Sequence, residues 1–197
     1  MRILKFGGSS LATADCIRNV GRIILENTRR EPAVIVVSAF QGVTNELLEC
    51  AQLAENGDAR WESVWRQIVA RHRSTLDRLI AKRKSAPFQR RLVTLFQDLH
   101  DALHGVQLLN HAPPRARDLV TSFGERLSAL IIAGYLTESR TAQFVDAREL
   151  IFTDDNFTSA NVIFPRTNRA VRQYFARLLR TSRRPDRRGD WFHCIDN

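Results

Sequence analysis

The sequence predicts a layered α/β fold with a largely parallel sheet and a helical insertion. Two short apolar segments, residues 2–6 and 33–38, are each followed by a segment whose apolar residues recur at helical spacing. Residues 33–38 form a mainly β-branched run, as expected of a parallel strand covered on both faces. Two long amphipathic segments then follow without a strand between them. The resulting order, β-α-β-α-α-α-α-β-α, indicates helices layered on a sheet, with extra helices inserted.

The first quarter of the chain alternates strands and helices. The strand over 2–6 runs directly into Gly7-Gly8-Ser9-Ser10, and the next segment has Asp15 in its first turn. Its apolar residues predict a helix: Cys16, Ile17, Val20, Ile23 and Ile24. After the strand over 33–38, a second helix is predicted to end near Asn56-Gly57, with the stripe Val43, Leu47, Ala51 and Ala54.

Residues 59–84 and 88–111 are predicted to be two long helices, each with one apolar stripe. The stripes consist of Trp61, Val64, Trp65, Ile68 and Leu79 in the first, and of Phe88, Leu92, Leu95, Leu99, Leu103 and Val106 in the second. Pro113-Pro114 ends this pair, because proline cannot continue a helix. The remaining predicted elements are a helix over 119–136, a strand over 143–145 and a helix over 167–179.

Composition is that of a globular protein. Apolar residues make up 44% and charged residues 26% of the 197 residues, which excludes collagen-like, mucin-like and wholly disordered classes. The longest apolar stretches, 33–40 and 127–136, are shorter than the about 20 residues that span a membrane. The N-terminus has no apolar run typical of a secretory signal. The three cysteines, Cys16, Cys50 and Cys194, are widely spaced, so we expect a reducing cytoplasm. Since no apolar stretch is long enough to span a membrane, we expect no membrane partner.

The net charge of +9 is concentrated at one end of the chain. Residues 166–197 contain nine Arg and three Asp, so the rest of the chain is nearly neutral. A general nucleic-acid-binding surface is therefore not predicted, and we expect no nucleic-acid partner. An Arg-rich tail that binds nucleic acid is the alternative, and salt-dependent retention of the tail on DNA tests it.

The strongest candidate site is Lys5-Phe6-Gly7-Gly8-Ser9-Ser10, at the end of the first predicted strand. Glycines between a strand and a helix let backbone N–H groups approach a phosphate, and the N-terminus of the helix adds favourable partial charge. Lys5 supplies a point charge for phosphoryl oxygens. The segment is not the common P-loop, because the lysine precedes the glycines. A plain glycine turn with a surface lysine is the alternative interpretation.

This segment resembles the opening of aspartate kinases in the amino-acid kinase family, K-[FY]-G-G-[ST]-S. Three further segments are similar to family motifs and follow in the expected order: Val37-Ser38-Ala39 with Val43–Leu48, Ser122–Ser128, and Asp146-Ala-Arg with Thr153-Asp154. The matches cover roughly residues 1–180. The resemblance implies a three-layer α/β sandwich, truncated before its C-terminal half, with residues 1–181 as the N-terminal part of a kinase domain. It leaves open a monofunctional enzyme or a fusion to homoserine dehydrogenase.

The resemblance also implies how ATP is held. Lys5 would be the catalytic residue, stabilising the γ-phosphoryl group in transfer, and the backbone of Gly7, Gly8 and Ser9 would bind the phosphate. Since two anions must be brought together, such catalysis is mostly positioning and charge neutralisation. ATP would arrive as its Mg²⁺ complex, which shares that work.

On the aspartate side, the resemblance implies that Ser38, Thr44 and Glu125 bind the substrate, with Glu125 pairing with its α-ammonium. Ser38 and Thr44 also fit ordinary capping residues, and Glu125 fits a residue that favours a helix N-terminus. The family further implies a homo-oligomer for the intact enzyme, with L-aspartate and ATP as its small-molecule partners.

Three histidines on the predicted insertion, His100, His104 and His111, invite a metal interpretation. The pair at i and i+4 can share a helix face. There is no H-E-x-x-H motif and no cysteine nearby, so we interpret these histidines as structural and expect no metal site.

The end of the chain departs from the family pattern. The family continues with a V-T-G-F-I-A strand and an R-G-G-S-D segment, whereas residues 182–197 are Arg-rich, polar and without periodicity. Codons for residues from Asp186 onward, read one nucleotide later, permit Val-Thr-Gly-Phe-Ile-Ala, and the Trp191 codon forces the glycine. We infer an out-of-frame translation of residues 182–197, with a genuine Arg-rich tail as the alternative.

The expected function is that of the aspartate kinase lineage: phosphoryl transfer from MgATP to the β-carboxylate of L-aspartate, the first step of lysine, threonine and methionine synthesis. We expect this truncated chain to be inactive and to leave an unpaired sheet edge. The alternative is a non-catalytic fragment that binds an intact kinase subunit.

Overall fold

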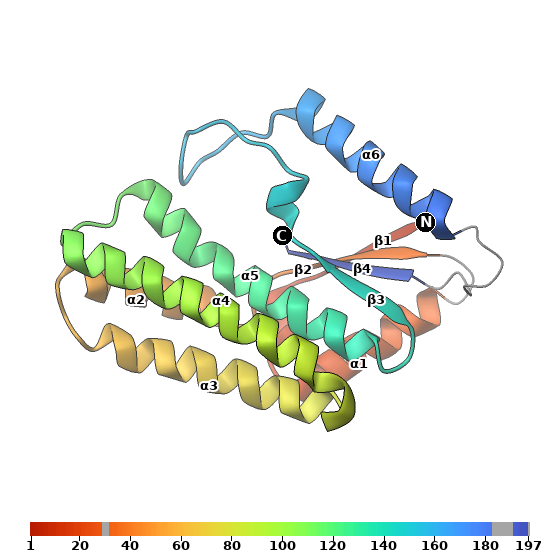
Figure 1. Cartoon of the computed structure of the whole chain (residues 1–197), viewed down its shortest axis with the longest axis horizontal. Coiled ribbons are helices and arrows are strands. Elements are labelled where there is room, and N and C mark those ends of the chain that lie inside the picture. Colours follow the sequence, from red (N-terminus) through yellow and green to blue (C-terminus); the bar gives the residue numbers. More distant parts are fainter. Residues whose placement is uncertain (29–31, 183–190, 197) are drawn as a thin grey trace.

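The computed structural model describes residues 1–28, 32–182 and 191–196. At its centre is a four-stranded sheet in the order β1-β2-β4-β3 (Figure 1). The strands are β1 (Arg2–Phe6), β2 (Ala33–Val37), β3 (Thr141–Val145) and β4 (Trp191–Asp196). Each neighbouring pair is parallel, so the carboxyl ends of all four strands lie at one edge of the sheet.

Helices cover both faces of this sheet, as predicted for a three-layer α/β sandwich (Figure 1). One face is covered by α1 (Ala14–Asn27) and α5 (Pro114–Leu136), and the opposite face by α6 (Phe164–Ser182). Three inserted helices pack against one another and against α5: α2 (Val43–Glu55), α3 (Trp61–Leu79) and α4 (Lys82–Leu109). The predicted helical insertion therefore lies beside the α5 layer, away from α6.

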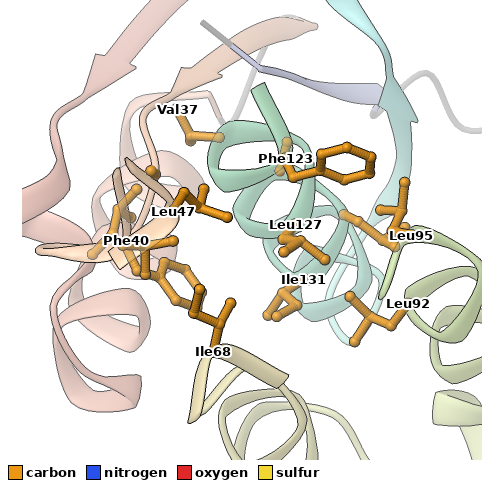
Figure 2. Close-up of a cluster of buried hydrophobic side chains, with 14 of the residues drawn as sticks. Val37, Phe40, Leu47, Ile68, Leu92, Leu95, Phe123, Leu127 and Ile131 are labelled. Atoms are coloured by element: carbon orange, nitrogen blue, oxygen red, sulfur yellow. The ribbon is translucent and has the colours of Figure 1, made fainter. Parts of the chain in front are cut away.

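The hydrophobic core is centred on α5. Phe123, Leu127 and Ile131 lie on this helix, between side chains of the β2–α2 segment and side chains of α4 (Figure 2). Among the described helices, α5 is long and apolar enough to cross a membrane by length and composition, but 72% of its apolar window is buried inside the protein. Its apolar character is that of a central core helix.

The break between the two long helices is not where the sequence predicted it. We expected helices over 59–84 and 88–111, whereas α3 ends at Leu79 and α4 starts at Lys82. Ile80 between them is extended and 3% exposed. Its side chain packs against Gly134 of α5 so closely that a β-carbon on that glycine would stand 2.5 Å from Ile80 Cδ1. The buried Ile80 therefore lies at the break, and Pro87, between the two predicted helices, lies inside α4.

Other boundaries differ by a few residues. The helix predicted over 119–136 begins at Pro114, which occupies the first helical turn, where the missing N–H of proline costs nothing. Two short 3₁₀ turns were not predicted: η1 (Gly8–Leu11) and η2 (Ala147–Glu149).

The end of the chain contributes a strand that the sequence did not predict. Trp191–Asp196 form β4, between β2 and β3, although the sequence of this tail showed no strand periodicity. A strand that lies between two others can form backbone hydrogen bonds with both neighbours, whatever its side-chain pattern. β4 follows α6 along the chain, where the resemblance expected the V-T-G-F-I-A strand. Residues 183–190 and 197 lie outside the described residues, and the out-of-frame origin of 182–197 stays a prediction.

Candidate functional site

The site predicted around Lys5 begins at the carboxyl end of β1. Lys5 is the fourth residue of β1 and its side chain is exposed. Gly7 and Gly8 lead into η1, where the N–H of Ser10 donates to the Gly7 carbonyl at 3.0 Å. The exposed turn therefore offers the backbone of Gly7, Gly8 and Ser9 to solvent or to a ligand.

The first long helix starts further from the glycines than the sequence predicts. We expected the glycines to lead directly into a helix whose N-terminus adds positive potential. The helix α1 starts only at Ala14, and the Thr13 hydroxyl accepts from the N–H of Cys16 at 3.2 Å as its N-cap. The first turn of α1 thus has its own cap and begins after η1, so the groups next to the glycines are Lys5 and the turn amides.

Gly8 brings the first turn against the loop that follows β2. A β-carbon on Gly8 would stand 2.9 Å from the carbonyl oxygen of Ala39, closer than real β-carbons approach. Around Gly7, by contrast, a β-carbon would meet no atom within 4 Å. Glycine is therefore required at position 8 by packing, and position 7 is open on the side of the missing side chain.

The predicted residues Ser38 and Thr44 lie in the loop after β2 and in the helix that follows it, respectively. The Ser38 N–H donates to the Phe6 carbonyl at 3.1 Å, and its carbonyl accepts from the buried Ser128 hydroxyl at 2.7 Å. Gly42, at φ +87°, turns the chain into α2, a conformation that favours glycine. Thr44 follows in the first turn of α2 and is exposed. Ser38 is thus fixed by its backbone, and the turn at Gly42 places Thr44 at the start of a helix.

The helix α5 brings Glu125 to the same loop. A β-carbon on Gly124 would stand 2.8 Å from Ala39 Cβ and 3.3 Å from Leu47 Cδ1. The backbone of α5 therefore packs directly against the loop at Ala39 and against Leu47 of α2. Glu125 is the next residue and is half-buried. The η1 turn, the loop after β2 and α5 therefore meet around Ala39. The predicted residues lie on these elements or, as with Lys5 on β1 and Thr44 on α2, on the elements next to them in the chain.

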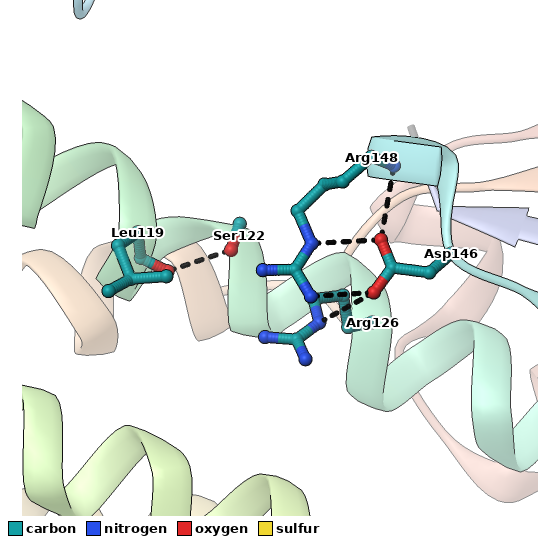
Figure 3. A network of polar contacts seen from close by, with 5 residues as sticks. All are labelled: Leu119, Ser122, Arg126, Asp146 and Arg148. Carbon is teal, nitrogen blue, oxygen red and sulfur yellow. Dashed lines mark hydrogen bonds and ion pairs between the residues drawn. The ribbon is translucent and has the colours of Figure 1, made fainter. Parts of the chain in front are cut away.

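A charged network fixes α5 near this point (Figure 3). Asp146, at the end of β3, accepts from Arg148 at 2.7 and 2.9 Å, and its Oδ2 lies 3.4 Å from Arg126 Nε. Arg126 and Asp146 side chains are only 8% and 13% exposed. Burial raises the pKa of Asp146, but the hydrogen bonds and charge of Arg148 outweigh it, and the pKa lies below its ordinary value. The residue after Glu125 is thus tied to the sheet.

Sequence reasoning missed two residues of α3 beside the loop after β2. The ring of His72 is fully buried and stacks on Phe40, with centroids 4.8 Å apart and an interplanar angle of 8°. Arg71 contacts both the η1 turn and α2. The only signal in the sequence is that His72 continues the apolar stripe of Ile68, Leu76 and Leu79, which says nothing of the loop that it contacts.

The three histidines of the insertion do not gather around a cation site. His100 packs against the rings of Trp61 and Trp65, at centroid distances of 5.1 and 5.0 Å. Within the described residues, no group of three or more His, Cys, Asp or Glu side chains could hold a metal ion. His100 therefore serves in packing.

Comparison with known proteins assigns this arrangement to a family. The model of the amino acid kinase family matches residues 1–186. The chain belongs to the amino acid kinase family. The match contains the η1 turn, the loop after β2 and Glu125, and it ends before β4.

Curated relatives in this family are aspartokinases. Aspartokinase 2, chloroplastic, of Arabidopsis thaliana is 32% identical over 166 residues, covering 82% of this chain and 29% of its own length. The bifunctional aspartokinase/homoserine dehydrogenase 1, chloroplastic, of Zea mays is 27% identical over 177 residues, covering 88% of this chain and 19% of its own length. The chain thus spans less than a third of the length of these relatives.

Solved structures share the fold. Escherichia coli aspartokinase III, in a complex with lysine and aspartate and in another with aspartate and ADP, superposes with a TM-score of 0.80 at 23% identity. Each superposition covers 100% of this chain and 42% of the other. The amino-acid kinase architecture expected from the motifs is confirmed.

Proposed function

We propose that this chain carries the phosphoryl-side and aspartate-side residues of an ATP:L-aspartate phosphotransferase. The observation that supports it is the convergence of the η1 turn, the loop after β2 and α5 around Ala39. This point lies at the carboxyl ends of parallel strands, where open α/β sheets bind their ligands. The relatives are named aspartokinases, and one solved neighbour holds aspartate and ADP.

On the phosphate side, Lys5 and the turn amides face the same anion in this proposal. Lys5 extends from β1, and its ammonium neutralises negative charge as the γ-phosphoryl group leaves ADP. The N–H groups of Gly8 and Ser9 hold the phosphoryl oxygens, and ATP enters as the MgATP substrate.

On the acceptor side, Ser38, Thr44 and Glu125 bind L-aspartate. The Glu125 carboxylate pairs with the α-ammonium, a charge-assisted contact that fixes the orientation of the substrate. The Ser38 and Thr44 hydroxyls bind carboxylate oxygens of the substrate. A β-carboxylate oxygen of the substrate then attacks the γ-phosphorus of ATP. The bond between the γ-phosphorus and the bridging oxygen breaks, ADP leaves, and 4-phospho-L-aspartate forms. This reaction commits aspartate to lysine, threonine and methionine synthesis, and we place it in the cytoplasm.

Binding tests the proposal on the 197-residue chain itself. We expect isothermal titration calorimetry to detect L-aspartate and MgATP binding separately. The variant Glu125→Gln should weaken only aspartate binding, and Lys5→Ala only MgATP binding. Glu62→Gln, which alters an exposed ion pair on α3, is the matched control. Failure of the native chain to bind L-aspartate at millimolar concentration contradicts the proposal.

Turnover by this chain alone is not expected. The resemblance assigns adenine binding and the arginine of R-G-G-S-D to sequence that this chain does not contain. Loss of positioning alone removes about 7–11 kcal/mol of catalytic advantage, or at least about five decades of rate. The measurement is aspartyl phosphate formation, trapped as the hydroxamate. A rate of about 1 s⁻¹, within the ordinary enzyme range, shows that the residues in hand are sufficient.

The second candidate is a fragment that pairs with an intact kinase subunit. Among the described strands β1 has β2 as its neighbour on one side alone, and Ile3 on β1 is 69% exposed. An open edge strand is a template for pairing with another chain. Co-purification with an intact aspartokinase, lost when Ile3 is changed to Lys, supports this candidate, and equal recovery of the variant contradicts it.

A further inference from the structure

We propose that Arg71 and His72, neighbours on α3, are positioning residues that hold the phosphate turn and the substrate loop in one arrangement. The phosphate turn is residues 7–13, and the substrate loop is residues 38–46. This inference rests on the proposed function for its consequence in ligand binding. The restraint of both segments by α3 is argued from the contacts of Arg71 and His72 alone.

Arg71 joins the two segments through one guanidinium. Its Nη2 donates to the carbonyl of Ala12 at 3.2 Å, and its Nη1 lies 3.5 Å from Glu46 Oε1. Ala12 is the C-cap of η1, and Glu46 is in the first turn of α2, where its N–H donates to the Gly42 carbonyl at 3.1 Å. The side chains of Arg71 and Glu46 are 31% and 34% exposed, so the contact is partly shielded from water. A planar guanidinium can hold both partners at once because its donors point in fixed directions.

His72 holds the substrate loop from its buried side. Its ring stacks on Phe40, which is 2% exposed, and the ring of Phe96 meets it edge-on at 6.3 Å. The His72 Nδ1–H donates to the Ile68 carbonyl at 2.7 Å, which fixes the plane of the ring. The Phe40 carbonyl in turn accepts from the N–H of Val43 at 3.0 Å. The stack therefore fixes the residue that closes the turn into α2.

The two contacts restrain different segments because neighbouring residues on a helix point about 100° apart. Arg71 reaches the surface between η1 and α2, and His72 reaches the core under Phe40. The helix α3 packs against α2, α4 and α5, so it provides a fixed base for both. A displacement of about 1 Å between reacting groups can cost about a hundredfold in rate. Neither residue touches a reacting atom, so the role is positioning.

Amide hydrogen exchange on the 197-residue chain tests the restraint. Arg71→Gln should accelerate exchange about tenfold in residues 8–13 and in residues 42–47, and leave α5 unchanged, because only local opening becomes easier. Arg66→Gln is the matched control, since Arg66 lies on α3 and pairs with Glu62 of its own helix. Uniform acceleration through the core, or no acceleration in either segment, overturns the proposal.

Two further variants separate the two arms of the guanidinium. Arg71→Lys keeps a cation for Glu46 but not the second donor, so residues 8–13 should exchange faster while residues 42–47 stay protected. Glu46→Gln should show the reverse. Glu46→Gln removes the ion pair while Arg71 stays in place, so this variant still tests the restraint if variants of Arg71 do not fold. Equal effects of both variants on both segments contradict separate restraint.

Ligand binding then tests the consequence. Calorimetry should show aspartate affinity lowered about tenfold by Arg71→Gln and unchanged by Arg66→Gln, because only Arg71 joins the two segments. Unchanged affinity beside altered exchange overturns the positioning role. If the native chain binds no aspartate, the proposed function fails, whereas the exchange experiment still decides whether α3 restrains the loops.

Discussion

The carbonyl oxygen of Ala39 lies 2.9 Å from the place where a β-carbon on Gly8 would stand. This contact joins the turn after β1 to the loop after β2, two segments separated by about thirty residues of sequence. Backbone contacts of this kind leave no room for adjustment, because a carbonyl in a hydrogen-bonded loop cannot rotate away as a side chain can. The two glycines of the motif therefore differ in their roles.

Gly8→Ala should destabilise the protein by about 1–3 kcal/mol, the ordinary cost of forcing an atom into a packed contact. Gly7→Ala should change stability little, because its φ of −81° suits alanine and its β-carbon meets no atom within 4 Å. Urea unfolding followed by circular dichroism measures both. Equal losses for the two variants would show that the glycines act through the flexibility of the turn rather than through this contact.

His72 should make stability depend on pH between 6.5 and 4. Burial lowers the pKa of His72 from 6.5 to about 4, with the charge of Arg71 acting in the same direction and the hydrogen bond to Ile68 opposing it. The unfolded chain therefore takes up a proton below pH 6.5 that the folded chain does not, and stability falls as the pH falls. At about pH 4 the loss should approach about 3 kcal/mol.

The variant His72→Phe isolates this effect because it keeps a ring against Phe40 and removes the titrating group. Unfolding measured from pH 7 to pH 4 should lose its dependence on pH down to about 4.5. His104→Gln, at an exposed histidine of α4, should retain the native profile. A profile that His72→Phe leaves unchanged would assign the acid sensitivity to other groups.

Asp146→Asn should destabilise the chain by about 3 kcal/mol, as expected when one partner of a buried ion pair is removed. The amide cannot balance the charge of Arg126, whose side chain is 8% exposed. Asp101→Asn is the control, because the Asp101 carboxylate is exposed and accepts from Gln97 on the same helix. Thermal unfolding compares the two, and a cost below about 0.5 kcal/mol for Asp146→Asn would mean that the pair adds no more than a surface contact.

In the longer enzyme that the out-of-frame interpretation predicts, Lys5→Ala should lower kcat by about two to three orders of magnitude, because charge neutralisation in the transition state is lost. Folding should be unaffected, since the side chain is exposed. The hydroxamate assay measures kcat, and Lys82→Ala on α4 serves as the control. Near-normal turnover of Lys5→Ala would remove this lysine from the mechanism.

Glu125→Gln in the same enzyme should raise the KM for aspartate by about tenfold or more, with a smaller change in kcat. Glutamine has the size of glutamate but lacks the charge that pairs with the α-ammonium. Initial rates at varied aspartate and saturating MgATP separate the two constants. An aspartate KM equal to the native value would leave Glu125 as a residue of the helix α5 alone.

The amino-acid sequence by itself determined the strands β1, β2 and β3, the order of the long helices, and the family. Local patterns carry this information: the β-branched run of β2, the helical stripes of α1 to α4, and the glycines and serines of the opening motif all act between residues close in the chain. The order of these segments favoured parallel strands, since a parallel pair needs a long crossover connection, which is usually a helix.

Only the tertiary structure decided which residues meet. The buried position of Ile80 at the helix break depends on Gly134, and the need for glycine at position 8 depends on Ala39. The role proposed for His72 depends on its stacking on Phe40. The last strand, β4, exists because β2 and β3 leave a place whose backbone groups need partners. Each of these is a contact between segments far apart in sequence, and its energy depends on packing and burial that no local pattern encodes.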